Sequence, residues 1–453
     1  MYCKNTTNSE KMKTTLKTLF SGSLLLISVI GQAQTDTVRW NLSECIQYAI
    51  DNNLTIKQAE LSYNSAEINY NQTRASVLPS LSANSSFNIM PGQSAIDPVT
   101  YKEMTQTTQS ASVGLNTSIT LFSGLRTYNQ IKQNKLSLEK SQLYIEEQKN
   151  SITLNIAEAY VQAIFLKENI KTSENNVTAS QKQYDLAKAK YDHGALSRTS
   201  LADIQSQLAS AQHNLVSAQN SLAQQILNIK QMLELEPNQE FDIIIPEISP
   251  DSLIVPNKMD IYNRAHEIMP EIKESNLAVD IAEYDVKIAQ ASYMPSLSAS
   301  AGLNTRWSSM KDDNIATQFG DNINSSIGFN LSIPIFNKLS TRSRVATSKI
   351  QVNQSQLNLT TAEKNLYKKI EQAWTNATAA QSELISAEYS KKSAEEAYSL
   401  AQQQFQLGSL STNELLNSQN SFLSAEVQYL QKKFSCVLYY QLIQFYMGNE
   451  IKL

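Results

Sequence analysis

The sequence predicts a mainly α-helical fold with a membrane β-barrel, built from one helix–strand–strand–long helix–helix unit that is used twice. Three observations predict it. Glycine and proline are scarce, with 11 and 10 among 453 residues, so long stretches lack the residues that punctuate turns. The chain also repeats itself at a spacing of about 214 residues, and each copy holds two segments that alternate between apolar and small polar residues.

The N-terminus has the pattern of a secretory signal. Four lysines between residues 4 and 17 make a basic start, residues 19–30 form an apolar core, and Gly31-Gln32-Ala33 resembles a cleavage site. About a dozen apolar residues are too few to span a bilayer. We therefore expect residues 1–33 to be a signal peptide that is removed on export.

Composition narrows the class of protein. Charged residues make up only 18% of the chain and the formal net charge is −4, and loss of the lysine-rich signal makes the exported chain more acidic. A mildly acidic exported protein is a poor binder of nucleic acid, so we expect no nucleic-acid partner. No later stretch offers eighteen apolar residues in a row, so any membrane contact must be made without a transmembrane helix.

The duplication is visible in matching segments that occur in the same order in both halves. They are residues 75–84 (ASVLPSLSAN) with 291–300 (ASYMPSLSAS), 112–116 (SVGLN) with 326–330 (SIGFN), and 191–197 (YDHGALS) with 405–411 (FQLGSLS). One structural unit used twice explains this order. We place the first repeat at 34–235, a proline-rich linker at 236–257, and the second repeat at 258–453.

Four segments carry the strict alternation that predicts strands. We place them at about 80–90 and 111–122 in the first repeat and at about 296–307 and 325–336 in the second, with a long external loop at 90–109. One face of each segment is apolar, and the other carries serine, asparagine and glycine. A soluble sheet would alternate in the same way, but its solvent face usually carries lysine and glutamate, so the pattern favours transmembrane barrel strands.

The segments without glycine and proline predict helices. Long helices are expected at 125–193 and 338–407, and shorter return helices at 198–235 and 412–447. Both long segments keep a 3.5-residue repeat rich in alanine and serine, which is typical of closely packed helices. About seventy residues give on the order of 105 Å of helix, so these helices are expected to form a rod or a tube.

The order of these elements resembles the TolC-like outer-membrane efflux proteins. The resemblance rests on Leu-Pro-Ser-Leu at 78–81, Leu-Phe-Ser-Gly at 121–124, Pro-Ile-Phe-Asn at 334–337 and the pattern Tyr/Phe-x-x-Gly-x-Leu-Ser at both helical turns. It implies a homotrimer with a twelve-stranded barrel in outer-membrane lipid, continued by a periplasmic α-helical tube.

The same resemblance implies a function. The protein would be a passive exit duct that exports small molecules or proteins and is gated at its periplasmic helical tip. Its partners would be a periplasmic adaptor (membrane fusion) protein and an inner-membrane efflux pump or ABC transporter.

Part of this expectation follows from geometry. Four strands cannot close a barrel, for which about eight is the practical minimum, so the chain must oligomerise. Eight strands from a dimer would fill their interior with side chains, whereas twelve leave an open lumen. We expect the small polar face to line that lumen, through Ser82, Asn84, Ser118, Asn304 and Asn330.

The two tight turns between the long and the return helices are the sharpest candidate sites. Glycine can end a helix with a positive φ and the following serine can cap the next helix, which explains both residues as structure. It does not explain the leucine that both turns keep at an end expected to be exposed. The resemblance implies that this tip meets the adaptor, through Gly194, Leu196, Ser197, Arg198, Gly408, Leu410, Ser411 and Thr412.

The resemblance also implies a pore gate made of polar and acidic residues just beyond the turns. The matching positions are Thr199, Ser200, Asp203, Glu414 and Asn417, and acids are fewer here than in the family pattern. Three copies of Glu414 around a narrow axis would attract cations. Asp203 is equally well interpreted as a solvated carboxylate on a helix surface.

The sequence shows no enzymatic constellation. Its three histidines, His193, His213 and His266, lack a cysteine or carboxylate at ligand spacing, and phosphate- and dinucleotide-binding motifs are absent. We therefore expect no enzymatic activity, no cofactor and no metal site. Beyond the signal the chain keeps Cys45 and Cys436, which are two buried thiols in the favoured interpretation and a disulfide joining the two ends in the other.

An alternative from another class stays open at this point. A non-conducting helical rod of the cell envelope, whose strands only hold an oligomer together, would show the same repeats and the same signal. The two interpretations differ in whether the polar strand faces enclose a conducting path.

Overall fold

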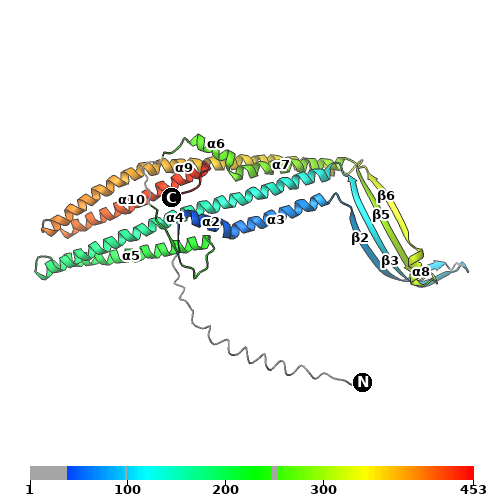
Figure 1. Ribbon diagram of the computed structural model, residues 1–453, viewed down its shortest axis with the longest axis horizontal. Coiled ribbons are helices and arrows are strands. Elements are labelled where there is room, and N and C mark those ends of the chain that lie inside the picture. Colours follow the sequence, from blue (N-terminus) through cyan, green and yellow to red (C-terminus); the bar gives the residue numbers. More distant parts are fainter. Residues whose placement is uncertain (1–37, 97–98, 247–253) are drawn as a thin grey trace, which may run out of the picture.

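The computed structural model describes residues 38–96, 99–246 and 254–453 and shows an elongated molecule (Figure 1). An antiparallel sheet stands at one end, and two helical hairpins form the other. The signal peptide expected at residues 1–33 lies outside the described residues. Within the described ranges, no helix combines the length and the apolar character needed to cross a membrane.

Each repeat contains short helices, a pair of strands and a helical hairpin. The first comprises α2 (Leu42–Asn52), α3 (Leu54–Ala75), β2 (Ser80–Ile96), β3 (Glu103–Phe122), α4 (Arg126–Asp192) and α5 (Arg198–Met232). The second comprises α6 (Lys258–Ile268), α7 (Pro270–Gln290), the 3₁₀ turn η2 (Ala291–Tyr293), β5 (Ser296–Ser308), α8 (Ile315–Asp321), β6 (Asn324–Ser332), α9 (Ser340–Gln406) and α10 (Thr412–Tyr446). Two three-residue strands, β1 (Val38–Trp40) and β4 (Phe241–Ile243), lie outside this scheme.

The hairpins of the two repeats match residue by residue. Helices α4 and α9 each have 67 residues, α5 and α10 each have 35, and every boundary recurs 214 residues later. Even the entry into the long helix is repeated, because Gly124 and Leu125 have positive φ, as do Lys338 and Leu339. In both copies a pair of left-handed residues redirects the chain from the strand into the helix.

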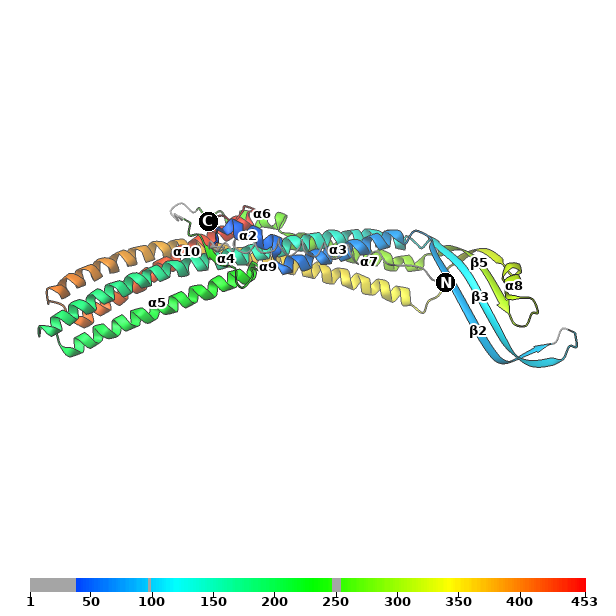
Figure 2. The ribbon, with the colours of Figure 1, turned by 60° about the horizontal axis from the view of Figure 1, so that its bottom comes forward.

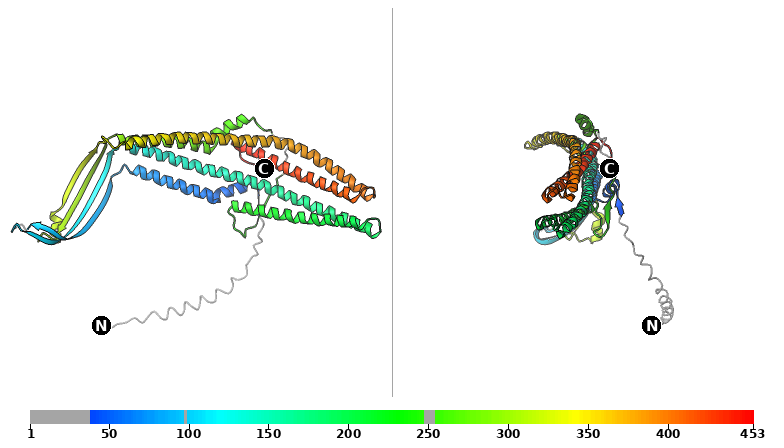
Figure 3. Two further views of the ribbon diagram at one scale, coloured as in Figure 1. Left: turned by 180° about the vertical axis from the view of Figure 1, so that it is seen from behind. Right: turned by 90° about the vertical axis from the view of Figure 1, so that its left-hand side faces the viewer.

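The helices form one curved layer, which Figure 3 shows end-on. Near the sheet, neighbouring helices follow the order α3, α4, α7, α9, and toward the tip the order is α5, α4, α10, α9. Alanines such as Ala163, Ala187, Ala377 and Ala401 are buried along the long helices. The small-residue stripe therefore packs as the 3.5-residue repeat predicts, because small side chains let helices approach closely.

The strands form one antiparallel sheet in the order β2-β3-β5-β6, which bends away from the end of the helical layer (Figure 2). Strands β2 and β3 extend beyond the expected 80–90 and 111–122, so the loop expected at 90–109 is mostly strand. Pro91 and Gly92 resemble strand breakers, but they lie in a register shift between Met90 and Gln93, where the ladder is interrupted in any case.

Strand β6 differs in the opposite direction. It ends at Ser332, four residues before the expected end at 336. Pro334 explains the difference, because it has no backbone N–H to donate to a ladder. The connection between β5 and β6 also contains α8, which the sequence analysis did not predict. Its Gln318 is 2% exposed and its side chain bonds to both backbone groups of Ser308.

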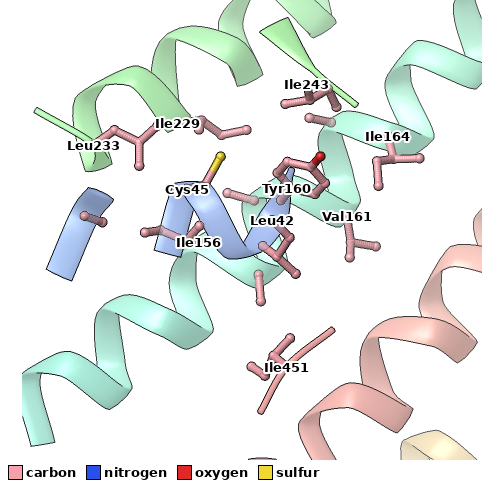
Figure 4. Packing of buried hydrophobic residues seen from close by; sticks show 14 of the residues in the cluster. Leu42, Cys45, Ile156, Tyr160, Val161, Ile164, Ile229, Leu233, Ile243 and Ile451 are labelled. Carbon is pink, nitrogen blue, oxygen red and sulfur yellow. The ribbon is translucent and has the colours of Figure 1, made fainter. Parts of the chain in front are cut away.

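A buried cluster around the middle of α4 joins the start of the chain to the linker (Figure 4). Strand β1 pairs in parallel with β4, a contact that the sequence analysis missed. The Tyr160 hydroxyl lies 2.6 Å from the carbonyl oxygen of Ile244 and 3.0 Å from that of Trp40. One buried side chain therefore holds both short strands against the long helix.

The two cysteines are free, buried thiols in different places. Cys45 is fully buried in the cluster of Figure 4, whereas Cys436 packs near Ala380 and Leu384. Burial, with a smaller effect of the Glu44 charge, raises the pKa of the Cys45 thiol to about 12. The interpretation as two buried thiols is confirmed, and the disulfide alternative is wrong.

Candidate functional site

The strand register gathers small polar side chains on one face of the sheet. Residues paired directly across antiparallel strands point to the same side, and Asn84 pairs with Gly114, which pairs in turn with Asn304. We call the face that they share the polar face. All the residues expected at the lumen lie on it, namely Ser82, Asn84, Ser118, Asn304 and Asn330.

Asparagine side chains interlock across the middle of the polar face. The Asn116 amide donates a hydrogen bond to Asn84 Oδ1 at 2.7 Å. A Cβ at Gly114 would come within 2.1 Å of Asn304 Oδ1, so glycine at this position makes room for that side chain. Asn116 and Gly114 were not among the expected lumen residues, although a glycine inside a strand signals a close approach of this kind.

The opposite face of the sheet is apolar and, apart from the end against which α8 packs, exposed. We call it the apolar face. It exposes large side chains such as Leu81 (77%), Ile327 (81%) and Phe329 (72%). Soluble monomers rarely expose an apolar patch of this extent, so the face requires a membrane or a partner to cover it.

The helical tip is built from two similar turns. Gly194 and Gly408 adopt φ values of +74° and +79°, and the next amide N–H, of Ala195 or Ser409, bonds back to the end of the long helix at 2.8 and 3.0 Å. The two turns are also tied together, because the Lys190 ammonium donates to the Phe405 carbonyl oxygen at 2.8 Å.

The expectation for the leucines at these turns needs correction. Leu196 and Leu410 are half-buried and pack against a cluster that includes Phe405 and Leu415, so packing explains why both turns keep a leucine. Thr412 is also buried, at 7% exposed. The tip residues with exposed side chains or backbone are Gly194, Ser197, Arg198, Gly408 and Ser411.

Glu414, expected at the gate, caps its own helix. Ser411 donates to Glu414 Oε2 from its backbone N–H at 3.1 Å and from its hydroxyl at 2.7 Å, and the Glu414 N–H donates back to the Ser411 hydroxyl at 3.3 Å. This capping box holds the pKa of the Glu414 carboxyl below its usual range. The carboxylate is therefore exposed and charged, but its position is set by the helix end.

The other expected gate residues lie on the same first turns. Ser200 occupies the position in α5 that Glu414 occupies in α10, and its N–H bonds to the Ser197 hydroxyl at 3.1 Å. Thr199 and Asn417 are exposed, and Asp203 is half-buried. Each repeat therefore offers one carboxylate among these residues: Asp203 in the second turn of α5 and Glu414 in the first turn of α10.

Comparison with known proteins agrees with this geometry. The model of the family described as "Outer membrane efflux protein" matches residues 45–234 and 261–448, which together span most of the chain and both repeats. The chain belongs to this outer membrane efflux protein family. The resemblance inferred from the sequence is thereby confirmed, and the protein is an outer membrane efflux channel whose helices extend into the periplasm.

Individual members of the efflux protein family align along nearly the whole chain. The outer membrane efflux protein BepC of Brucella suis biovar 1 (strain 1330) is 22% identical over 426 residues, covering 93% of this chain and 88% of BepC. The Campylobacter jejuni CmeC outer membrane channel superposes with a TM-score of 0.78 at 19% identity, covering 90% of this chain and 85% of CmeC. The outer membrane protein VceC of Vibrio cholerae gives 0.76 at 17% identity, covering 91% and 97%.

These comparisons support the fold class predicted from the sequence, a largely helical chain with the architecture of an outer membrane channel.

Within the part of the chain that the structure describes, no cluster of three or more His, Cys, Asp or Glu residues is placed to hold a metal ion. One histidine differs from the expectation that all three stand apart from acids. His266 Nε2 lies 3.4 Å from Glu363 Oε1 on α9, a contact that their sequence separation conceals.

Three carboxylates meet between α4 and α7 in the periplasmic part of this efflux protein. Burial, a hydrogen bond with Glu274 and the charges of Glu274 and Glu271 raise the pKa of Glu147 to about 7, against the opposing charge of Lys369. Lys140 and Lys369 lie 3.5 and 3.9 Å from Glu274 and Glu271. Two lysines therefore face three acids, and a proton on Glu147 relieves the imbalance.

This cluster predicts a pH-dependent stability. Because the folded-state pKa of Glu147 lies above its ordinary value of 4.5, the folded state favours the proton. The resulting stabilisation is present below about pH 4.5 and is lost as the pH rises through about 7. In the detergent-solubilised protein, Glu147→Gln should make the thermal unfolding temperature fall less as the pH rises. Glu158→Gln, at an exposed position on the same helix, should keep the wild-type decline. If the unfolding temperature of Glu147→Gln falls with pH as steeply as that of the wild type, Glu147 is not the group responsible.

Proposed function

We propose that three copies of the chain form a channel-tunnel, a passive exit duct with a twelve-stranded barrel and a helical tube. The observation that carries this proposal is the four-stranded sheet with one polar and one apolar exposed face. Among the described residues, strands β2 and β6 each pair on one side only. Four strands cannot close on themselves, but β6 of one copy can pair with β2 of the next.

The free edges of the helical layer support the same assembly. On α3, Leu54, Leu61 and Ile68 are spaced seven residues apart and are 57%, 65% and 67% exposed. On α9, Ile350 and Leu357 repeat this spacing with 66% and 68% exposed. Heptad-spaced aliphatic rows at both edges fit an α3–α9 contact between neighbouring copies. Family likeness supplies the number three.

Within a cell envelope, such a duct exports cargo that another machine drives. We propose that it receives small molecules or proteins from an inner-membrane efflux pump or ABC transporter through a periplasmic adaptor protein. The alternative is a non-conducting structural rod. The polar face favours the channel, because serine and asparagine suit a water-filled lumen, whereas a sheet that only holds an oligomer together has no need of a polar face.

We place the adaptor contact at the helical tip, on the exposed residues of the two turns. A photo-crosslinker at Ala195 or Ser409, which follow the two glycines and precede the serines that N-cap α5 and α10, should capture a periplasmic adaptor in cells. The same probe at Ser210, exposed on α5 away from the turn, should capture none. If neither tip position yields an adaptor adduct while the channel is produced normally, the tip is not the docking site.

We place the gate on the first turns of α5 and α10, with Thr199, Ser200, Asp203, Glu414 and Asn417 around the axis. Glu414→Gln removes three charges from the trimer but keeps a residue type that completes a capping box. It should lower the preference for cations in single-channel recordings. Ser411→Ala weakens the cap by about 1 kcal/mol and leaves the charge in place. An unchanged reversal potential in Glu414→Gln would remove Glu414 from the gate.

A further inference from the structure

Arg306 stands on the polar face near the end of the sheet farthest from the helices. It pairs with Ser112 on β3, two residues beyond the pair formed by Gly114 and Asn304, so its side chain shares their face. Strand β5 starts at Ser296 beside the helical layer, and Arg306 lies ten residues further on, toward the end where Figure 1 shows α8.

The guanidinium is isolated among neutral residues. The paired segments 80–88, 110–120, 296–308 and 324–332 contain no other Asp, Glu, Lys or Arg on either face. Arg306 is exposed and forms no ion pair with a described carboxylate. Besides its place in the strand ladder, its backbone carbonyl oxygen accepts a hydrogen bond from the Asn322 side-chain amide at 2.9 Å.

The acids nearest to it in sequence do not neutralise it. Asp312 and Asp313 precede α8, and Asp321 ends it. Helix α8 is fastened to the strand through Thr305, whose hydroxyl donates to the Phe319 carbonyl oxygen at 2.6 Å. Thr305 pairs with Val113 on the apolar face, so α8 lies against the side of the sheet that Arg306 does not face.

Threefold assembly turns this single charge into a ring. Strands about 4.8 Å apart and tilted about 40° put the backbone of a twelve-stranded barrel about 12 Å from its axis. A long arginine side chain pointing inward brings its charge to within roughly the Debye length of the axis, about 8 Å at physiological salt. Arginine keeps its charge at all physiological pH values, and a wall of serine and asparagine offers no opposing charge.

We propose that Arg306 is a charge-selecting residue of the lumen, where three guanidinium groups near the outer mouth favour anionic solutes over cations. This inference rests on the proposed trimeric channel and adds to it the charge class of solute that the outer half admits. The solute passes both this ring and the carboxylates at the tip. The ring therefore shifts the charge selectivity of the channel toward anions, but it does not alone decide whether the whole channel prefers anions or cations. Carboxylate, phosphate and sulfonate groups are the chemistry that such guanidinium groups attract.

The test is the reversal potential of the full-length protein in planar bilayers under a KCl gradient. Arg306→Gln should raise the cation-to-anion permeability ratio on the order of threefold, and Arg306→Glu should raise it further. Arg306→Lys should keep the wild-type value, as should Arg264→Gln, which removes an arginine from α6. Heat-modifiable oligomers of each variant show that the barrel has formed.

The outcomes separate the two proposals. If neither the wild-type protein nor Glu414→Gln carries current at any applied voltage, the channel itself is refuted and the role of Arg306 with it. If the wild-type protein conducts and both Arg306→Gln and Arg306→Glu leave the permeability ratio unchanged, the channel stands and Arg306 does not select charge.

Discussion

Arginine in place of Phe329 should keep the protein out of the outer membrane. Phe329 is 72% exposed on the apolar face, opposite Ala299, where the proposed barrel meets lipid. An arginine on the lipid face costs about 2–4 kcal/mol per chain near the bilayer midplane and less toward the interfaces, and the trimer carries three. Because about 1.4 kcal/mol corresponds to a factor of ten, heat-modifiable oligomer in the outer membrane fraction should fall about tenfold or more.

The neighbouring residue provides the control. Asn330 lies next on the same strand but on the polar face, opposite Ser298. Asn330→Arg introduces the same side chain into the proposed aqueous lumen, so oligomer should form at close to the wild-type level. If Phe329→Arg and Asn330→Arg accumulate equally well in the outer membrane, the assignment of the two faces to lipid and water is wrong.

Valine in place of Gly124 should disrupt the junction between the sheet and the helices. Gly124 has a φ of +64°, and a Cβ there would come 2.7 Å from both the Ala291 carbonyl oxygen and Met294 Cβ. A β-branched residue with positive φ is strained, and the overlap with backbone adds to the cost. We expect the free energy of unfolding to fall by about 2–5 kcal/mol, seen as a lower thermal unfolding temperature in detergent and faster proteolysis near residue 124.

Two further variants separate the clash from the backbone conformation. Lys338 is the counterpart of Gly124 in the second repeat and already has a positive φ as a non-glycine residue, so Lys338→Ala should change little. At the tip, Gly194 has a positive φ, and a Cβ added there would meet nothing within 4 Å, so Gly194→Ala should cost about 1–2 kcal/mol. A Gly124→Val protein as stable as Gly194→Ala would show that the junction has room to adapt.

The hairpins and the two faces of the sheet were predictable because their signals are long and periodic. The stretches without glycine and proline continue for many turns, and alternation fixes which strand residues share a face once one pair is known. Asn84, Asn304 and Asn330 therefore lie on the polar face, as the alternation predicts. Arg306 belongs to the same alternating row, but a single charge in a neutral row does not alter the periodicity, so the pattern gave it no separate role.

Other features depend on contacts that no local pattern reveals. Strands β1 and β4 have three residues each and lie about 200 residues apart, so neither carries a usable periodicity. Pro91 suggested that a strand ends, whereas the structure uses it within a bulge. Leu196 and Leu410 looked exposed because the cluster beneath them is assembled from both hairpins.

The capping role of Glu414 was readable in principle. Ser411 followed three residues later by Glu414 is the sequence signature of a capping box, and Asn41 with Glu44 forms another at the start of α2. The gate proposed at Glu414 uses the same carboxylate. Both roles are compatible, because a carboxylate fixed at a helix start by its cap is also a charge fixed in position.

The central claim is that three copies enclose a water-filled path through the outer membrane. The most direct measurement is the current across a planar bilayer after addition of the purified, full-length oligomer, with its stoichiometry determined by native mass spectrometry. A trimer that produces steady, stepwise conductance is the predicted result. A stable oligomer that never conducts at any applied voltage, in the wild type and in Glu414→Gln alike, would contradict the channel and favour the structural rod.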